Sequence, residues 1–194
     1  MKRLIALAGV LAFAAGCTAS NDGAGDGTET PAAEAAPEAP YELELAAPTG
    51  FEALDGAERP AHVTPEYRDW VFQLTGGTES ELIIVSSYYL PEDAGTADRA
   101  GQIALVQPHD AELGNTSRAD NYRDALVHRE QGLHRYFYAE DAEGFREGHY
   151  YYLFSGRHLI QISCQWGAGG GGQAVQTACM SLTESLPVPE TWGA

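Results

Sequence analysis

The sequence predicts one α/β domain of the α+β type, in which a mostly antiparallel sheet is flanked by helices. Three strand-like segments follow one another at 133–140, 145–155 and 157–166, and the turns between them are too short for a parallel crossover. Helical patterns at 96–107 and 173–186 precede and follow this block. Because the strands are consecutive and the helices lie outside them, the pattern favours an antiparallel sheet with helices packed against it.

The first half of the domain carries further strand patterns. Apolar and acidic residues alternate over 41–45, which predicts a half-buried strand, and 51–54 is placed to pair back on it. Apolar residues recur at every second position in 68–75, and 81–90 (ELIIVSSYYL) is β-branched and aromatic. We expect 81–90 to be the central strand of this half.

The ends of the two helices are also marked in the sequence. Thr96 is a favourable N-cap residue, and Pro108 is expected to end the first helix because proline removes a backbone donor. In the second helix, apolar residues recur three or four positions apart from Val175 to Leu186. Pro187 follows and predicts where this helix stops.

Turn lengths predict which side chains share a face of the sheet. We interpret 142–144 as a three-residue hairpin loop and 155–156 as a two-residue turn. This register gives one apolar face: Leu133, Phe137, Tyr151, Leu153, Ile160, Ile162, Cys164 and Trp166. It gives an aromatic and polar face on the other side: His134, Tyr136, Tyr138, Tyr150, Tyr152, Phe154, Arg157 and Leu159.

Cysteine positions predict a disulfide. Cys164 falls on the apolar face of the sheet and Cys179 on the apolar stripe of the following helix, so both lie where sheet and helix meet. A bond that closes this loop of ~15 residues stabilises a fold by roughly 3 kcal/mol. We therefore expect a Cys164–Cys179 disulfide, which is typical of an oxidising compartment.

The N-terminus has the pattern of an export signal. Residues 1–16 combine a basic start with a short apolar run, which is far below the ~20 residues needed to cross a bilayer. The motif Ala14-Ala15-Gly16-Cys17 resembles the lipobox of bacterial lipoproteins, although Ala14 stands where that family usually has Leu. The resemblance implies that Cys17 carries diacylglycerol and fatty acyl chains such as palmitate. The alternative is ordinary signal cleavage near Ala14, which leaves Cys17 as a free thiol.

The region 17–40 reads as a lipid-anchored, flexible acidic linker. It is rich in Ala, Gly, Pro and Thr, its only charges are acidic, and from Thr18 to Pro40 it has no aromatic or large aliphatic residue. The predicted organisation is therefore a signal peptide at 1–16, this linker, and one globular domain at 41–194. We expect the chain to be anchored in the cell membrane and to lie outside the cytoplasm, in the periplasm or at the cell surface.

Charge and motif content exclude several classes of function. The net charge of −17, from 28 acidic and 11 basic residues, repels phosphate backbones and argues against nucleic-acid partners. The chain has one lysine, Lys2, and it lies in the signal, which excludes Schiff-base and P-loop chemistry. A Gly-x-Gly-x-x-Gly pattern at 167–172 lacks the following strand and acidic residue of a dinucleotide site, so we expect a loop, no nucleotide and no cofactor.

The positions of four histidines raise the question of a metal site. His128 and His134 are six positions apart, and His149 and His158 fall on adjacent predicted strands. Two imidazoles with a carboxylate such as Glu147 are a set of ligands that zinc accepts. Exposed or hydrogen-bonded histidines at strand edges account for the pattern more simply, so no metal is expected.

The order of elements resembles a known fold family. Strands, a helix, an antiparallel block and a C-terminal helix ending in Ser185-Leu186 are similar to small lipoproteins with the α/β/α sandwich of the PsbP-like superfamily. The opening from Tyr41 to Phe51, with Pro48 and Gly50, is similar to theirs. The resemblance covers about 41–187 and implies a binding or assembly domain without catalytic residues.

A surface rich in tyrosine is the predicted binding site. Tyrosine gives a large rigid contact area with a hydrogen-bonding tip, which suits sugars, peptidoglycan fragments or a protein partner. The candidate residues are His134, Tyr136, Tyr138, Tyr150, Tyr152 and Arg157. The alternative is that the first helix covers this face and the tyrosines are packing.

These observations favour a non-catalytic lipoprotein domain that binds an envelope protein or glycan. The second hypothesis is an exported carrier that holds a small amphipathic ligand between the sheet and the first helix. A hydrolase that uses Asp, Glu and His is a third.

Overall fold

The computed structural model of the protein is one antiparallel sheet with a helix packed on each face. It describes residues 35–57, 59, 61–114, 119–141 and 144–193. Seven strands lie in the order β1-β2-β3-β7-β6-β5-β4, and every neighbouring pair is antiparallel. The α+β prediction is therefore confirmed. The predicted signal peptide, Cys17 and most of the linker lie outside the described residues.

The elements have the following bounds along the chain. The strands are β1 (Phe51–Ala53), β2 (Tyr67–Leu74), β3 (Leu82–Tyr89), β4 (Arg123–Val127), β5 (Glu130–Asp141), β6 (Gly144–Ser155) and β7 (His158–Gly167). The helices are α1 (Arg99–Glu112), the short 3₁₀ helix η1 (Ala119–Asn121) and α2 (Gly172–Ser185). No helix in the described part of the chain has the length and apolar character to span a membrane.

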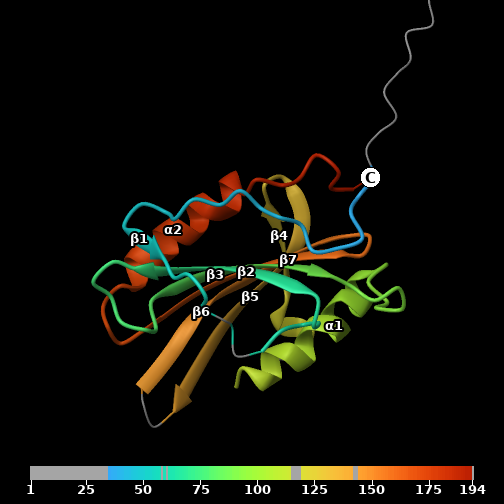
Figure 1. Ribbon diagram of the computed structural model, residues 1–194. Coiled ribbons are helices and arrows are strands. Elements are labelled where there is room, and N and C mark those ends of the chain that lie inside the picture. Colours follow the sequence, from blue (N-terminus) through green and yellow to red (C-terminus); the bar gives the residue numbers. More distant parts are fainter. Residues whose placement is uncertain (1–34, 58, 60, 115–118, 142–143, 194) are drawn as a thin grey trace, which may run out of the picture. The chain divides into compact units, whose positions relative to one another are not determined.

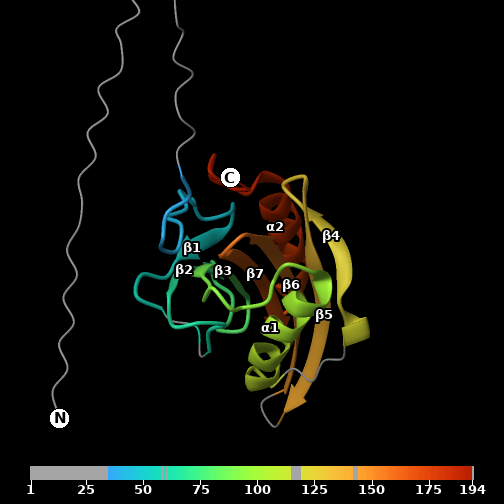
Figure 2. The same ribbon diagram turned by 90° about the vertical axis from the view of Figure 1, so that its right-hand side faces the viewer.

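Two apolar clusters hold the layers together, one under each helix. Figure 1 shows α1 and α2 on opposite sides of the sheet, and Figure 2 shows β1 and β4 at its two edges. The cluster under α2 includes Phe72, Ile83, Val85, Ile160, Ile162, Cys164 and Trp166. The cluster under α1 includes Tyr88, Ile103, Val106, Leu133, Phe137, Tyr150, Tyr152 and Leu159. The predicted disulfide is confirmed: Cys164 of β7 is bonded to Cys179 of α2.

The predicted strand at 41–45 is wrong, although its burial pattern is right. Tyr41 and Leu43 are buried, yet residues 40–48 form no strand, and β1 pairs with β2 instead, with Phe51 opposite Leu74. Tyr41 and Leu43 belong to the cluster under α2, and the hydroxyl of Tyr41 contacts Thr191 near the C-terminus. The alternation therefore reflects packing on the core rather than a hydrogen-bonded ladder.

Helix α1 begins and ends later than predicted. Its N-cap is Asp98, whose carboxylate accepts a hydrogen bond of 2.8 Å from the backbone N–H of Gly101. The helix continues past Pro108 to Glu112, although the proline removes one backbone donor. Asp110, which lies two residues after the proline, is fully buried and paired with the sheet, and this contact holds the last turn in place.

The faces predicted for β5 are also wrong, because β5 and β6 pair in a register shifted by one residue from the expected one. Asp141 pairs with Gly144, whereas the predicted loop sets it opposite Phe145. A slip of one residue moves every side chain of a strand to the opposite face. Leu133 and Phe137 consequently lie under α1, whereas the alternate residues of β5 face the α2 side.

The β6–β7 turn lies one residue later than predicted, which shifts the pairing of the two strands by two residues and leaves the faces unchanged. Ser155 pairs with His158, so residues 156–157 form the loop. Since side-chain direction repeats every two residues, a shift of two restores the original pattern. Ile160, Ile162 and Cys164 therefore lie on the predicted apolar face.

Candidate functional site

The structure divides the six predicted binding residues into three places. Tyr150 and Tyr152 are buried under α1 and pack in its core cluster. Arg157 lies in the β6–β7 turn, where its guanidinium sits 4.2 Å from the ring centre of Tyr89. The remaining three residues, His134, Tyr136 and Tyr138, lie on the opposite face of the sheet from Tyr150 and Tyr152. The six residues do not form one surface, and their role in binding stays a prediction.

An aromatic patch nevertheless forms around the last three residues, on the β5–β6 hairpin visible in Figure 1. We call it the histidine–tyrosine patch, and it consists of His134, Tyr136, Tyr138, Phe145, Glu147, His149 and Tyr151. All seven side chains project from the α2 side of the two strands. Tyr136 and Tyr138 are 48% and 56% exposed, so α2 leaves this part of the sheet open.

Glu147 fixes the centre of the patch. Its carboxylate accepts a hydrogen bond from the hydroxyl of Tyr136 and another, of 2.8 Å, from the indole N–H of Trp166 in the core. The hydrogen bond to Glu147 raises the pKa of Tyr136 to about 12, so the phenol keeps its proton at neutral pH. Tyr136 is thus a protonated ring on the surface, with its hydroxyl hydrogen-bonded to Glu147.

Two histidines contact each other beside Tyr136. Nε2 of His134 lies 2.9 Å from Nδ1 of His149, and the ring centres are 5.0 Å apart. Burial, together with the neighbouring His149, lowers the pKa of His134 to about 4, and burial also lowers the pKa of His149. His149 and His158 lie on the adjacent strands β6 and β7, as predicted, but His149 pairs with Cys164 and His158 with Ser155, so the two histidines are not neighbours.

Sequence reasoning missed Phe145, Glu147 and His149 as neighbours of the β5 tyrosines. Their spacing, at alternate positions of β6, is the signal that could have placed them on one face. The rings of Tyr138 and Phe145 lie nearly parallel, with centres 6.1 Å apart, and extend the patch toward the hairpin loop. Among the described residues, no three His, Cys, Asp or Glu side chains are grouped to hold a metal ion.

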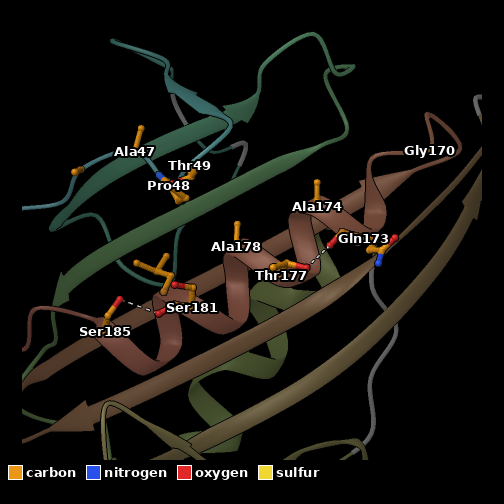
Figure 3. A pocket seen from close by; sticks show the side chains of 12 residues that line it. Ala47, Pro48, Thr49, Gly170, Gln173, Ala174, Thr177, Ala178, Ser181 and Ser185 are labelled. Atoms are coloured by element: carbon orange, nitrogen blue, oxygen red, sulfur yellow. Dashed lines mark hydrogen bonds between the residues drawn. The ribbon is translucent and has the colours of Figure 1, made fainter.

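A second candidate site is a groove beside α2. It has a volume of about 870 Å³ and is lined by one side of the helix and by the segment from Ala46 to Thr49 (Figure 3). Every lining residue is uncharged. The hydroxyls of Thr177 and Ser185 donate to the carbonyls of Gln173 and Ser181 in the helix itself. These two hydroxyls are hydrogen-bonded within the helix, and the groove offers an uncharged surface of mixed polar and apolar side chains, most of them small.

A third group of ionisable side chains is sealed inside the protein. Asp110 of α1 lies 2.6 Å from the guanidinium of Arg135 and accepts hydrogen bonds from Tyr122 and Tyr152. Burial alone would raise the pKa of Asp110, but hydrogen bonds from His109 and the two tyrosines, with the charge of Arg135, lower it overall. Because both charged side chains are buried, this cluster joins α1 to the sheet rather than forming an open site.

Comparison with known proteins gives distant structural likenesses. No protein-family model matches the sequence, and no curated protein does. A crystal structure from Bacteroides thetaiotaomicron VPI-5482 is 8% identical, with a TM-score of 0.41, over 67% of this chain and 40% of that one. The protein of unknown function PA94 from Pseudomonas aeruginosa is 12% identical, with a TM-score of 0.46, over 72% of this chain and 98% of its own.

Proposed function

We propose that the protein is an extracytoplasmic lipoprotein, anchored by lipid on Cys17, whose domain binds an envelope protein or glycan without catalysing a reaction. The observation that carries this proposal is the histidine–tyrosine patch. The Cys164–Cys179 disulfide supports the location, because such bonds persist mainly in oxidising compartments. The acidic linker gives the domain reach from the membrane.

The patch has the properties of a recognition surface for rings and hydroxyls. Tyr136 and Tyr138 project from paired strands, so their rings lose little conformational freedom when a ligand binds. Sugar rings and aromatic or aliphatic side chains stack on such faces. Glu147 and the two imidazoles supply hydrogen-bonding groups next to the rings. An exposed aromatic surface of this kind fits a partner that lies across it.

A second candidate function is a carrier of a small amphipathic ligand, and the groove beside α2 is the observation that favours it. From the sequence, such a ligand was expected between the sheet and the first helix. That space is filled by Ile103, Val106, Tyr150 and Tyr152, which are almost fully buried. A carried ligand would therefore lie beside α2, between the helix and Pro48 (Figure 3).

Crosslinking of the full chain in intact cells tests the patch. We expect the double variant Tyr136→Ala/Tyr138→Ala to lose the crosslinked partner or glycan, since both exposed rings are removed. The matched control is Leu126→Ala/Met180→Ala, which removes two exposed apolar side chains elsewhere and should leave the product unchanged. If the patch variant and the wild type gave equal amounts of the crosslinked product, the patch would not be the binding site.

A groove-filling variant separates the two candidate functions. Ala174 is exposed and lines the groove, so Ala174→Trp places a large ring in it without altering the patch. We expect this variant to keep the crosslinked product. Loss of binding in Ala174→Trp, with retention in the tyrosine variant, would favour the carrier instead.

A further inference from the structure

The two histidines of the patch are close enough to share one ion. We propose that Nε2 of His134 and Nδ1 of His149 form a two-histidine site for a late first-row divalent metal ion, with Cu²⁺ bound most tightly. Imidazole nitrogen is a preferred ligand of Cu²⁺, Ni²⁺ and Zn²⁺, and Cu²⁺ has the highest affinity in this series. This site goes beyond the proposed binding of a partner, because it requires no partner to form.

The backbone holds the two imidazoles in place. His134 pairs with Tyr151 and His149 pairs with Tyr136, so the histidines are diagonal neighbours on one face of the β5–β6 ladder. On its other side, His149 pairs with Cys164, which the disulfide ties to α2. Since both strands are fixed, the backbone of the site is preorganised, and only the two rings have to adjust when an ion binds.

The separation of the two nitrogens suits a shared ion. Two nitrogens bound at about 2.05 Å are about 2.9 Å apart when the ligand–metal–ligand angle is 90° and about 3.3 Å apart when it is tetrahedral. The observed distance is 2.9 Å, so the two nitrogens already have the separation that a shared ion needs, and rotation of each ring away from the line that joins them directs both lone pairs toward one point. The smaller angle is that of tetragonal Cu²⁺ and Ni²⁺ complexes.

The protonation state also suits ligation. A hydrogen bond between two imidazole nitrogens requires that one of them lacks a proton, and neutral imidazole is the form that binds metals. When the ion binds, the imidazole that donates this hydrogen bond loses its proton to solvent. That imidazole then takes up a proton from solvent on its other ring nitrogen. Both imidazoles stay neutral, and no net proton is released.

Charges around the pair favour a cation overall. Glu147 lies two residues from His149 on the same face, and the whole chain has a net charge of −17. Arg123 of β4 is the positive side chain opposite His134, and it is exposed to solvent. Among the described residues, no further His, Cys, Asp or Glu side chain is placed to act as a third ligand. Water or a donor from a bound partner completes the coordination.

Copper titration of the full chain, purified in detergent with glycine as a competing chelator, tests this site. We expect a single tight Cu²⁺ per chain, weaker Ni²⁺ and Zn²⁺, and an electron paramagnetic resonance spectrum with two coupled imidazole nitrogens. Loss of a direct ligand costs at least as much as the roughly tenfold loss seen for outer-shell partners. We therefore expect His134→Gln and His149→Gln each to lower Cu²⁺ affinity at least about tenfold.

Two control variants test whether copper binds at this pair of histidines. His128 is an exposed histidine in the β4–β5 turn, and His128→Asn should keep the wild-type affinity. Tyr136→Ala/Tyr138→Ala should also keep the wild-type Cu²⁺ affinity. A loss of partner binding can therefore be told apart from a loss of metal binding. Unchanged affinity in both patch histidine variants would overturn the site. A wild-type spectrum with fewer than two imidazole nitrogens would do so even if the variants fail to fold.

Discussion

Replacing Asp110 by Asn removes one charge from the buried cluster that joins α1 to the sheet. Asp110 is 0% exposed and Arg135 is 2% exposed, so neither charge is solvated by water. In Asp110→Asn the side chain keeps its size, but the guanidinium of Arg135 loses the carboxylate 2.6 Å away. The variant therefore isolates the value of the charge rather than of the packing.

The expected loss in the free energy of unfolding is large. Removing one partner of a buried ion pair costs about 3–5 kcal/mol, because the other charge stays buried without compensation. Tyr152→Phe is a milder test, since it removes one hydroxyl that donates to Asp110 at 2.6 Å. A hydrogen bond to a charged group contributes about 1.5–3 kcal/mol. The two losses should not add, because both variants act on the same carboxylate.

Urea unfolding at neutral pH, followed by tryptophan fluorescence and circular dichroism, measures these losses. The pKa of Asp110 is lowered in the folded state, so its contribution is present above the ordinary value of 3.8 and is lost as the pH falls toward the folded value. The difference between wild type and Asp110→Asn should therefore shrink below about pH 4. A neutral-pH loss under about 1 kcal/mol would refute the reasoning.

Two further predictions concern the cysteines. Cys164→Ser/Cys179→Ser should lower the free energy of unfolding by about 3 kcal/mol, since the bond closes a 15-residue separation, and unreduced mass spectrometry of the wild type should show no free thiol at either position. Cys17→Ser should release the protein from the membrane fraction, whereas a membrane-bound Cys17→Ser variant would contradict the lipid anchor.

Local patterns in the sequence were sufficient to predict most of the elements. Strands β2, β3, β5, β6 and β7, helix α2 and the disulfide all follow from periodicity over short segments. The end of α1 could not be predicted in this way. Pro108 is a local signal to stop, but the contact between Asp110 and Arg135 joins residues far apart in the chain and keeps the helix intact.

Which side chains of β5 belong to the histidine–tyrosine patch depends on the register between β5 and β6, and a difference of one residue changes it. Both faces of β6 are aromatic, with Tyr150 and Tyr152 on one side and Tyr151 on the other, so either face of β5 makes a plausible match. Hydrophobic periodicity alone cannot choose between registers when both faces are half apolar. The three-residue loop that the sequence suggested placed His134 on the face of Tyr150 rather than beside His149.

Gly148 provides the physical reason for the observed register. Phe137 lies directly opposite Gly148, and a side chain added there would have its Cβ only 2.9 Å from the ring of Phe137 and against the carbonyl of Cys164. The ring therefore covers the glycine, which is a stabilising arrangement in sheets. Because His149 pairs with Cys164 of β7, β6 keeps its faces, and a slip of β5 by one residue would carry Phe137 to the α2 side, opposite His149, and His134 to the α1 side. The pairing of Phe137 with Gly148 thus keeps His134 on the open face, where it meets His149.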